Sequence, residues 1–198
     1  MNLLGIDFED WYHPELIRRH ISPIKHEPTV VNGLDKILDM LRRHDTYATF
    51  FVVGELLEFK PELLDKIIEN GHEIGFHTMH HTRLDQFEST EKFVNEIRTF
   101  SDLTNGKSKG FRAPTFSINQ KSAWAIDVLS DEGYVYDSSV VPAKTRMYGI
   151  PDAELKPYKI SSSSLEKNDP NSQLTEFPLL VAKLLGKRIP AGGGFYIR

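Results

Sequence analysis

The stretch Gly75-Phe76-His77-Thr78-Met79-His80-His81 follows a short apolar run at residues 72–74 and precedes a polar segment. Its outer histidines, His77 and His81, stand four positions apart. If the segment turns helically after a strand, both imidazoles fall on one face about one turn apart and can share one cation. Incidental surface histidines would give the same spacing. The stretch therefore raises the hypothesis of a metal site, which needs a further ligand.

Three carboxylates near the N-terminus supply candidates for that ligand. Asp7, Glu9 and Asp10 lie where a predicted strand, residues 3–8, ends. Two imidazoles and one carboxylate, with water in the remaining positions, form an open catalytic metal site and not a closed structural one. Arg112, at the tip of another predicted strand, offers a fork of donors that is suited to hold and orient a carboxylate. An ordinary surface arginine ahead of a turn proline is the alternative.

These segments carry a family resemblance. Phe8-Glu9-Asp10, His77 to His81 and Arg112-Ala113-Pro114, in this order, resemble the first three motifs of the polysaccharide deacetylases, carbohydrate esterase family 4. Those motifs are an aspartate pair after a strand, H-[ST]-x-x-H, and R-x-P. The variant at residues 7–12, DFEDWY, is more similar to the subgroup associated with exopolysaccharide synthesis. Asp7-x-Glu9 is also similar to the peptidoglycan deacetylase and allantoinase-like branch. The resemblance runs from residue 3 to at least Asp137.

Composition limits the domain organisation and the partners. A chain of 198 residues with 39% hydrophobic residues can bury one sizeable core. We therefore predict a single polysaccharide-deacetylase-like catalytic domain over residues 1–198. A net charge of -4 with scattered signs argues against nucleic-acid binding. The chain has no cysteine, which excludes disulfides and thiolate ligands. It also lacks a transmembrane-length apolar run and the features of a signal peptide, so we predict a cytoplasmic location.

Hydrophobic periodicity predicts alternating strands and helices. The strands are expected at residues 3–8, 47–54, 72–77, 108–112, 134–137 and 174–177. The helices are expected at residues 30–44, 61–70, 91–103 and 119–133, and residues 178–185 are expected to form a short apolar helix or run. This alternation with short links predicts a parallel sheet covered by helices. Gly192-Gly193-Gly194 has no following helix, which argues against a nucleotide-binding fold.

The family resemblance makes the fold class more specific. It implies an α/β fold, a distorted (β/α) barrel with about seven mostly parallel strands. In such barrels functional residues cluster at the carboxyl ends of strands, where Glu9, Asp10, His77 and Arg112 are all expected.

The C-terminal part departs from the family pattern. The family's last motif supplies a histidine as general acid, whereas no histidine follows His81 in this chain. Residues 192–196, GGGFY, resemble a segment that lies upstream of that histidine in the exopolysaccharide subgroup. We therefore expect a fragment that lacks its final strand and general acid. Its barrel would be unclosed at the C-terminus, and the exposed strand edge would favour homo-oligomers.

The resemblance implies a hydrolase of non-peptide C–N bonds. The expected reaction is removal of N-acetyl groups from a polysaccharide or amino-sugar precursor by a metal-activated water. The expected cofactor is a divalent metal, Zn first, with Co, Ni or Fe also suited to these ligands. Two alternatives remain open: an allantoinase-like amidohydrolase acting on a small ureide or amide, and a catalytically silent carbohydrate-binding module.

The roles of the three carboxylates are not fixed by the sequence. If strand alternation persists, Asp7 and Glu9 share a face, which makes Glu9 the ligand and Asp7 the base. Alignment on Phe8 against the main family instead makes Asp10 the ligand and Glu9 the base. We expect Asp10, with His77 and His81, to bind the metal, because alternation commonly breaks where a strand ends.

Further residues have secondary roles in this hypothesis. Glu9, Asp7 and Arg112 form the expected catalytic group, in which Arg112 orients the base. His80 is a weaker candidate ligand, because Zn sites usually take three protein ligands. The expected substrate-binding residues are Trp11, Tyr12, Pro114 and Asp137. For Trp11 and Tyr12 a place in the core, and for Asp137 a turn-forming role, are the alternatives.

Overall fold

The structure is a computed structural model that describes residues 3–21 and 26–192. The glycine-rich segment at 192–196 therefore lies outside the described residues, except for Gly192. The chain divides into two compact units. The first unit comprises residues 1–82 and 95–109, and the second comprises residues 83–94 and 110–198. The prediction of a single domain stays a prediction.

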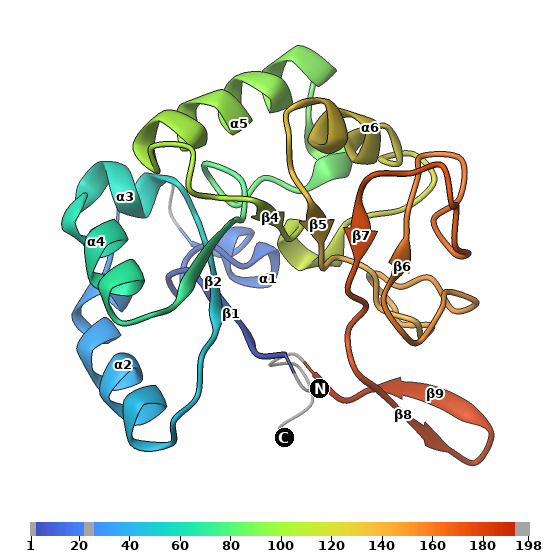
Figure 1. Ribbon diagram of the computed structural model, residues 1–198, viewed down its shortest axis with the longest axis horizontal. Helices are drawn as coiled ribbons and strands as arrows, with labels where there is room; N and C mark the ends of the chain where they lie inside the picture. The colour runs from blue at the N-terminus through green and yellow to red at the C-terminus, as the bar shows by residue number, and fades with distance from the viewer. Residues whose placement is uncertain (1–2, 22–25, 193–198) are drawn as a thin grey trace. The chain divides into compact units, whose positions relative to one another are not determined.

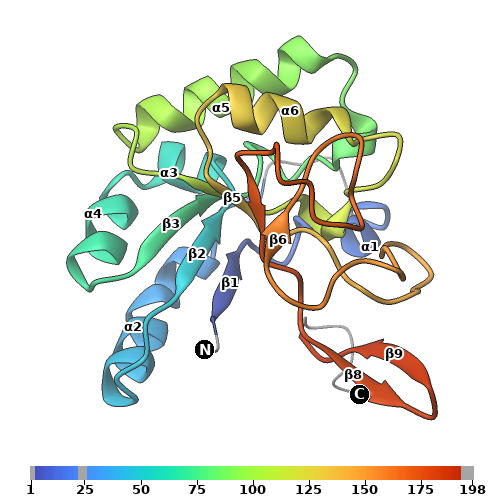
Figure 2. The ribbon, with the colours of Figure 1, turned by 45° about the vertical axis from the view of Figure 1, so that its right-hand side comes forward.

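The first unit is built on three parallel strands, β1 (Gly5–Phe8), β2 (Thr49–Val52) and β3 (Glu73–Phe76). β1 and β2 lie side by side in Figure 1, and Figure 2 shows β3 on the other side of β2. Their register aligns the last residues, because Phe8 is opposite Val52 and Val52 is opposite Phe76. The segments that follow all three strands therefore begin at one edge of the sheet.

The first unit contains several helical elements, and the longer ones bury an apolar stripe. These elements are α1 (Glu15–Arg18), the 3-10 helix η1 (Val30–Asn32), α2 (Leu34–Arg43), α3 (Glu55–Phe59), α4 (Glu62–Glu69) and most of α5 (Thr90–Leu103). In α2 the buried residues Leu34, Leu38 and Leu41 recur at helical spacing. The Phe76 ring of β3 packs against Phe100 of α5, with ring centroids 4.6 Å apart. Neither α1 nor α3 was expected from the sequence.

The second unit contains three further parallel strands and an antiparallel strand that pairs with one of them. Its strands β4 (Gly110–Phe111), β5 (Tyr136–Asp137) and β7 (Thr175–Glu176) are parallel, and β6 (Tyr158–Lys159) pairs antiparallel with β7. Its helical elements are η2 (Leu84–Gln86), η3 (Pro114–Phe116), α6 (Trp124–Asp131) and the start of α5. Phe93 of α5 packs against Phe111 and Trp124, with ring centroids 5.6 Å apart in both cases. β6 was not expected from the sequence.

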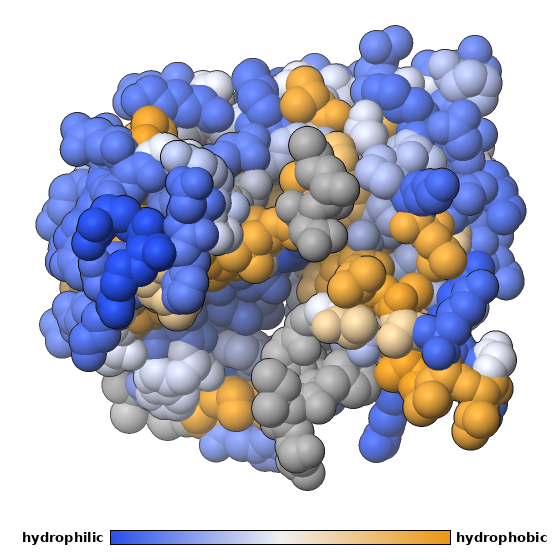
Figure 3. Space-filling model, turned by 60° about the horizontal axis from the view of Figure 1, so that its bottom comes forward, coloured by the Kyte–Doolittle hydropathy of each residue, from blue (hydrophilic) through white to orange (hydrophobic). Residues whose placement is uncertain are grey.

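A hairpin follows β7 and includes part of residues 178–185, for which a short apolar helix or run was expected; the helix does not form. Strands β8 (Val181–Leu184) and β9 (Lys187–Pro190) pair antiparallel (Figure 2). The turn residues Leu185 and Gly186 have φ of 49° and 77°. Two successive residues with positive φ end a helix but suit a two-residue hairpin turn, which explains the difference. The face drawn in Figure 3 carries grouped apolar side chains, and Leu180, Leu184 and Leu185 are exposed apolar residues of this segment.

The fold class is confirmed as α/β with seven mostly parallel strands, three in the first unit and four in the second. Among the described strands, β1 pairs only with β2 in its unit and β6 only with β7, and no closed barrel forms. In the described part of the chain, no helix has the length and apolar character needed to span a membrane.

Candidate metal centre

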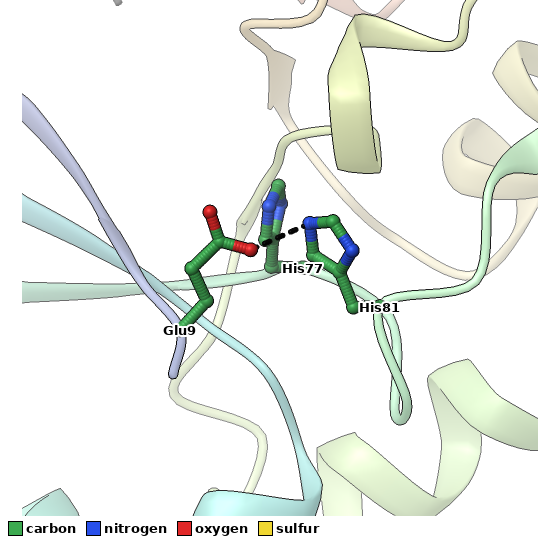
Figure 4. A group of neighbouring side chains, drawn as sticks. All are labelled: Glu9, His77 and His81. Atoms are coloured by element: carbon green, nitrogen blue, oxygen red, sulfur yellow. Dashed lines mark ion pairs between the residues drawn. The ribbon is translucent and has the colours of Figure 1, made fainter. Parts of the chain in front are cut away.

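Three side chains converge just past the aligned strand ends of the first unit. Glu9 follows β1, His77 follows β3, and His81 lies four positions further on. One potential ligand atom from each lies within 4.8 Å of the others. Figure 4 shows the three side chains turned towards one another. They therefore form a group that has the composition of a metal site.

The loop that carries the histidines is not helical. Thr78 and His81 have φ of 58° and 54°, so the chain reverses locally instead of continuing in a helical turn. The imidazole rings of His77 and His81 lie 5.1 Å apart between centroids, with an interplanar angle of 65°. The structure brings together the two histidines that the sequence spacing indicated, but through a loop and not a helix.

Backbone hydrogen bonds fix this loop on the start of α3. The Gly54 amide donates to the Thr78 carbonyl at 3.0 Å, and the Glu55 amide donates to the Met79 carbonyl at 2.9 Å. The Met79 amide donates to a carboxylate oxygen of Glu96 at 2.8 Å. A Cβ atom at residue 54 would lie 2.2 Å from Met79 Sδ and 3.2 Å from Met79 Cα, so a larger residue there would displace the buried Met79 side chain.

Glu55 links the loop to the segment that follows β1. Its Oε1 lies 2.9 Å from His13 Nε2, and its Oε2 lies 2.9 Å from His80 Nδ1. The Asp10 amide donates to His13 Nδ1, so the proton of a neutral His13 is on Nε2 and points to Glu55. These hydrogen bonds from His13 and His80 hold the pKa of Glu55 well below its usual value. The hydrogen bond to Glu55 in turn raises the pKa of His80.

Asp10, the expected ligand, lies in different surroundings from Glu9. Its Oδ2 accepts the amides of Thr29 and Val30, the latter at 2.7 Å. Its Oδ1 accepts the Trp11 amide at 2.8 Å and the Thr29 hydroxyl at 3.0 Å. Both oxygens are therefore engaged where η1 begins, as in a helix cap. The structure brings Glu9 to the two histidines and places Asp10 at this cap.

The expected substrate-binding aromatics lie beside the same segment. Trp11 is 51% exposed, so it can contact a ligand from solvent. The ring centroid of His26 lies 5.1 Å from that of Trp11 and 5.3 Å from that of Tyr12, on which it stacks. Burial, followed by the charge of Glu55, raises the pKa of Tyr12, so its hydroxyl stays protonated. An exposed indole next to stacked rings fits the expected sugar platform.

The other expected site residues belong to the second unit. Arg112 is buried and donates from Nε to the Ser138 carbonyl at 2.9 Å and from Nη2 to Ser138 Oγ at 2.8 Å. Pro114 is buried in η3. Asp137 is fully buried in β5 opposite Glu176. The expected roles of these residues, and of half-buried Asp7 in β1, stay predictions.

The chemistry of the converging group fits a divalent cation. Ligand atoms around a tetrahedral Zn are about 3.3 Å apart, which the separations in this group allow. His81 Nε2 lies 2.7 Å from Glu9 Oε2, yet that oxygen is buried without a hydrogen bond from any described residue. Both atoms are therefore close enough together to bind the same cation. Glu9, His77 and His81 are therefore the residues that could hold the metal.

Two imidazoles and a carboxylate at the carboxyl ends of parallel strands define an α/β protein with a candidate catalytic metal centre. The model of the polysaccharide deacetylase family matches residues 25–136. The chain belongs to the polysaccharide deacetylase family, as its motifs indicated. A second model, of a domain of unknown function (DUF3473), matches residues 138–198.

Curated relatives agree with this assignment. The chain is 26% identical over 179 residues to the peptidoglycan-N-acetylglucosamine deacetylase PgdA of Listeria monocytogenes, covering 81% of this chain and 37% of that protein. It is 38% identical over 70 residues to the peptidoglycan-N-acetylmuramic acid deacetylase PdaA of Bacillus subtilis, covering 35% of this chain and 25% of that protein. The chain thus spans only part of the length of these relatives.

Solved structures support the fold. A protein from Mycobacterium smegmatis described as a polysaccharide deacetylase aligns with a TM-score of 0.62 at 19% identity, covering 90% of this chain and 58% of that chain. The PuuE allantoinase aligns with a TM-score of 0.60 at 15% identity, covering 90% of this chain and 61% of that chain. At these identities the likeness concerns the fold alone.

Sequence reasoning missed three residues around these sites, namely His13, Glu55 and Glu176. Glu55 comes directly after β2, so a charged residue at the carboxyl end of a parallel strand could have identified it. Glu176 ends the parallel strand β7, so the same signal applied to it. His13 carried no such local signal, because its partner Glu55 lies far away in the sequence.

Proposed function

We propose that the chain is a metal-dependent N-deacetylase that removes acetyl groups from an acetylated amino-sugar polymer, such as peptidoglycan, or from its precursor. The observation that carries this proposal is the convergence of Glu9, His77 and His81 within 4.8 Å. Family membership and the deacetylase relatives support the reaction class. The exposed Trp11, two positions after Glu9 in the sequence, supports a sugar substrate.

In this proposal Glu9, His77 and His81 hold the cation, and Asp10 caps η1. A bound divalent cation would supply Lewis-acid polarisation of the acetyl carbonyl and a lower pKa for a water molecule. Asp7 would take the proton of the attacking water, because a residue two positions before Glu9 shares its face of an extended strand. Arg112 would hold and orient a carboxylate, as its fork of donors permits. Zn is the first candidate cation, with Co, Ni and Fe suited to the same ligands.

Acetate release tests the proposal. The purified chain would be incubated with N-acetylglucosamine oligomers, with peptidoglycan and with a small ureide, each with Zn, with Co, and with a chelator. We expect metal-dependent acetate release from the acetylated sugars. His77→Ala should reduce release to the chelated background, whereas His44→Ala, at an exposed position after α2, should leave it unchanged.

The outcomes separate the alternatives. Hydrolysis of the ureide without acetate release would favour a small-amide hydrolase. Binding of the sugar oligomers by the folded, metal-loaded chain without hydrolysis of any substrate would contradict the proposal and favour a binding module.

A further inference from the structure

Two buried carboxyl groups face each other in the second unit. Asp137 of β5 and Glu176 of β7 are opposite residues in a parallel ladder. Opposite residues on neighbouring strands project from the same face of the sheet, so the two carboxyl groups lie side by side. Both residues are 0% exposed. Bulk water therefore does not solvate the two groups.

Each carboxyl group has one oxygen with a partner and one without. Asp137 Oδ1 accepts the Ser139 hydroxyl at 2.5 Å, and Glu176 Oε1 accepts the Val140 amide at 3.0 Å. Asp137 Oδ2 and Glu176 Oε2 are buried without a hydrogen bond from any described donor. Two ionised carboxylates in this arrangement would repel each other and leave both oxygens unsatisfied. A proton on one oxygen, donated to the other, removes both problems.

The charges around the pair indicate which partner is ionised. Burial raises the pKa of both groups, and that of Glu176 is raised well above its usual value, with the charge of Asp137 as a further cause. The Arg112 guanidinium acts in the opposite direction on Asp137 and favours its ionised form. Tyr158 of β6 also faces the pair, but burial raises its pKa and its hydroxyl donates to the Leu165 carbonyl at 2.5 Å. The proton therefore resides on Glu176, although the titration belongs to the pair.

The pair is connected to Arg112 through the turn that follows β5. The Ser139 hydroxyl, which donates to Asp137, accepts the amide of Ala113 at 2.8 Å. The neighbouring Ser138 accepts both hydrogen bonds from Arg112 and donates from its hydroxyl to the Phe177 carbonyl at 2.9 Å. Asp137 and Glu176 thus hold the turn to which the Arg112 side chain and the next amide are bonded.

We propose that Asp137 and Glu176 share one proton and that this pair fixes the turn at residues 138–140, which makes Glu176 a positioning residue for Arg112. The link from Arg112 to catalysis rests on the proposed deacetylase function. The shared proton itself does not depend on that function.

Infrared spectroscopy tests the proton directly. The folded chain at neutral pH should show the carbonyl stretch of a protonated carboxylic acid. Glu176→Gln should lose this band, because the amide can donate to Asp137 and accept from Val140 without a shared proton. Asp137→Asn should shift or lose the band, because the acid no longer donates to a carboxylate, which provides a second variant if the first folds poorly. Glu69→Gln, at an exposed position that ends α4, should keep it.

Stability against pH gives an independent test with a definite sign. In the unfolded chain Glu176 ionises near its model value of 4.5, whereas the folded protein keeps the proton. The folding equilibrium constant of the wild type should therefore fall as pH rises from 4.5 towards the raised folded pKa, by up to about tenfold per pH unit. Glu176→Gln should remove this loss of stability. The melting temperature of this variant should therefore rise relative to that of the wild type as pH increases.

The positioning role has its own readout. The wild type should lose kcat for acetate release on the alkaline side once the shared proton dissociates, and Glu176→Gln should lack this limb while KM stays unchanged. Absence of the infrared band in the folded wild type, or a melting-temperature difference that is constant with pH, would overturn the shared proton. An identical alkaline limb in Glu176→Gln would overturn the positioning role. If no variant, including the wild type, releases acetate, the proposed function fails while the infrared and stability results still decide on the pair.

Discussion

Glu9 and Asp10 are adjacent carboxylates with different surroundings, and this difference decides the candidate metal centre. Glu9 lies beside His81, whereas four donors occupy the two oxygens of Asp10. The sequence predicted the two histidines and a carboxylate from this segment. It could not predict which carboxylate, because the partners of Asp10 at Thr29 and Val30 are brought there by the tertiary fold and show no pattern in the sequence.

Exchanging the two acids for their amides should separate their roles. Glu9→Gln should weaken Zn binding by more than about 100-fold, while the free energy of unfolding without metal stays within about 0.5 kcal/mol of the wild type. Asp10→Asn should instead lower the free energy of unfolding by about 1–3 kcal/mol, because backbone amides lose a charged acceptor. Zn titration and urea unfolding of both variants measure these changes. Loss of Zn binding in Asp10→Asn alone would make Asp10 the ligand.

Glu55 should contribute to stability in a pH-dependent way. Its pKa is held below the usual 4.5, so its hydrogen bonds to His13 and His80 stabilise the fold above that pH. Glu55→Gln should lower the free energy of unfolding at pH 7 by about 1–3 kcal/mol. The deficit should shrink as pH falls below 4.5 towards the depressed folded pKa. Urea unfolding across this pH range measures the deficit. Glu58→Gln, on the exposed side of α3, serves as the control, and an equal deficit at all pH values would contradict the prediction.

At the scale of elements, helices and strands with a repeating apolar pattern could be predicted from the sequence, whereas the shortest helices and strands could not. The helix at 91–103 and the strands that lead into Phe8, Val52 and Phe76 have clear apolar patterns, and the structure confirms them. Helices α1 and α3 have only four and five residues, too few for a pattern to repeat. Strand β6 has only two residues, and it is a strand because it pairs with β7. Tertiary contacts, and not local propensity, form such elements.

The turn of the β8–β9 hairpin offers a test at this scale. Leu185 has φ of 49° and is 94% exposed, so it bears left-handed strain without burying its side chain. Leu185→Asn should raise the free energy of unfolding by about 0.5–1 kcal/mol, because asparagine tolerates this conformation and Asn-Gly suits a two-residue turn. Thermal unfolding would measure the gain. Leu184→Asn, at an exposed strand position, should give no gain, and equal effects of the two changes would contradict this account.

At the scale of the whole molecule, metal binding should be linked to folding. All three candidate ligands belong to the first unit, so a cation that binds there stabilises this unit against unfolding. Zn at about 100 times its Kd should add about 2.7 kcal/mol to the free energy of unfolding. Hydrogen exchange should slow in strands β1 to β3.

The matched histidine variants complete this prediction. His77→Ala should abolish the Zn-dependent gain in melting temperature and in exchange protection, whereas His44→Ala should keep both. A Zn effect of the same size in His77→Ala would place the cation elsewhere on the chain.

The ladder between β5 and β7 has a consequence for folding kinetics. The contact from the Val140 amide to Glu176 joins residues 36 positions apart, whereas the neighbouring ends of helices and turns close much shorter loops. Closing a long loop costs entropy before its contacts form, so this ladder is expected to form late on the folding path. Until then both carboxyl groups remain in water and ionised at neutral pH. The final association of these strands therefore takes up a proton from the solvent, so refolding in a weakly buffered neutral solution should raise the pH of that solution.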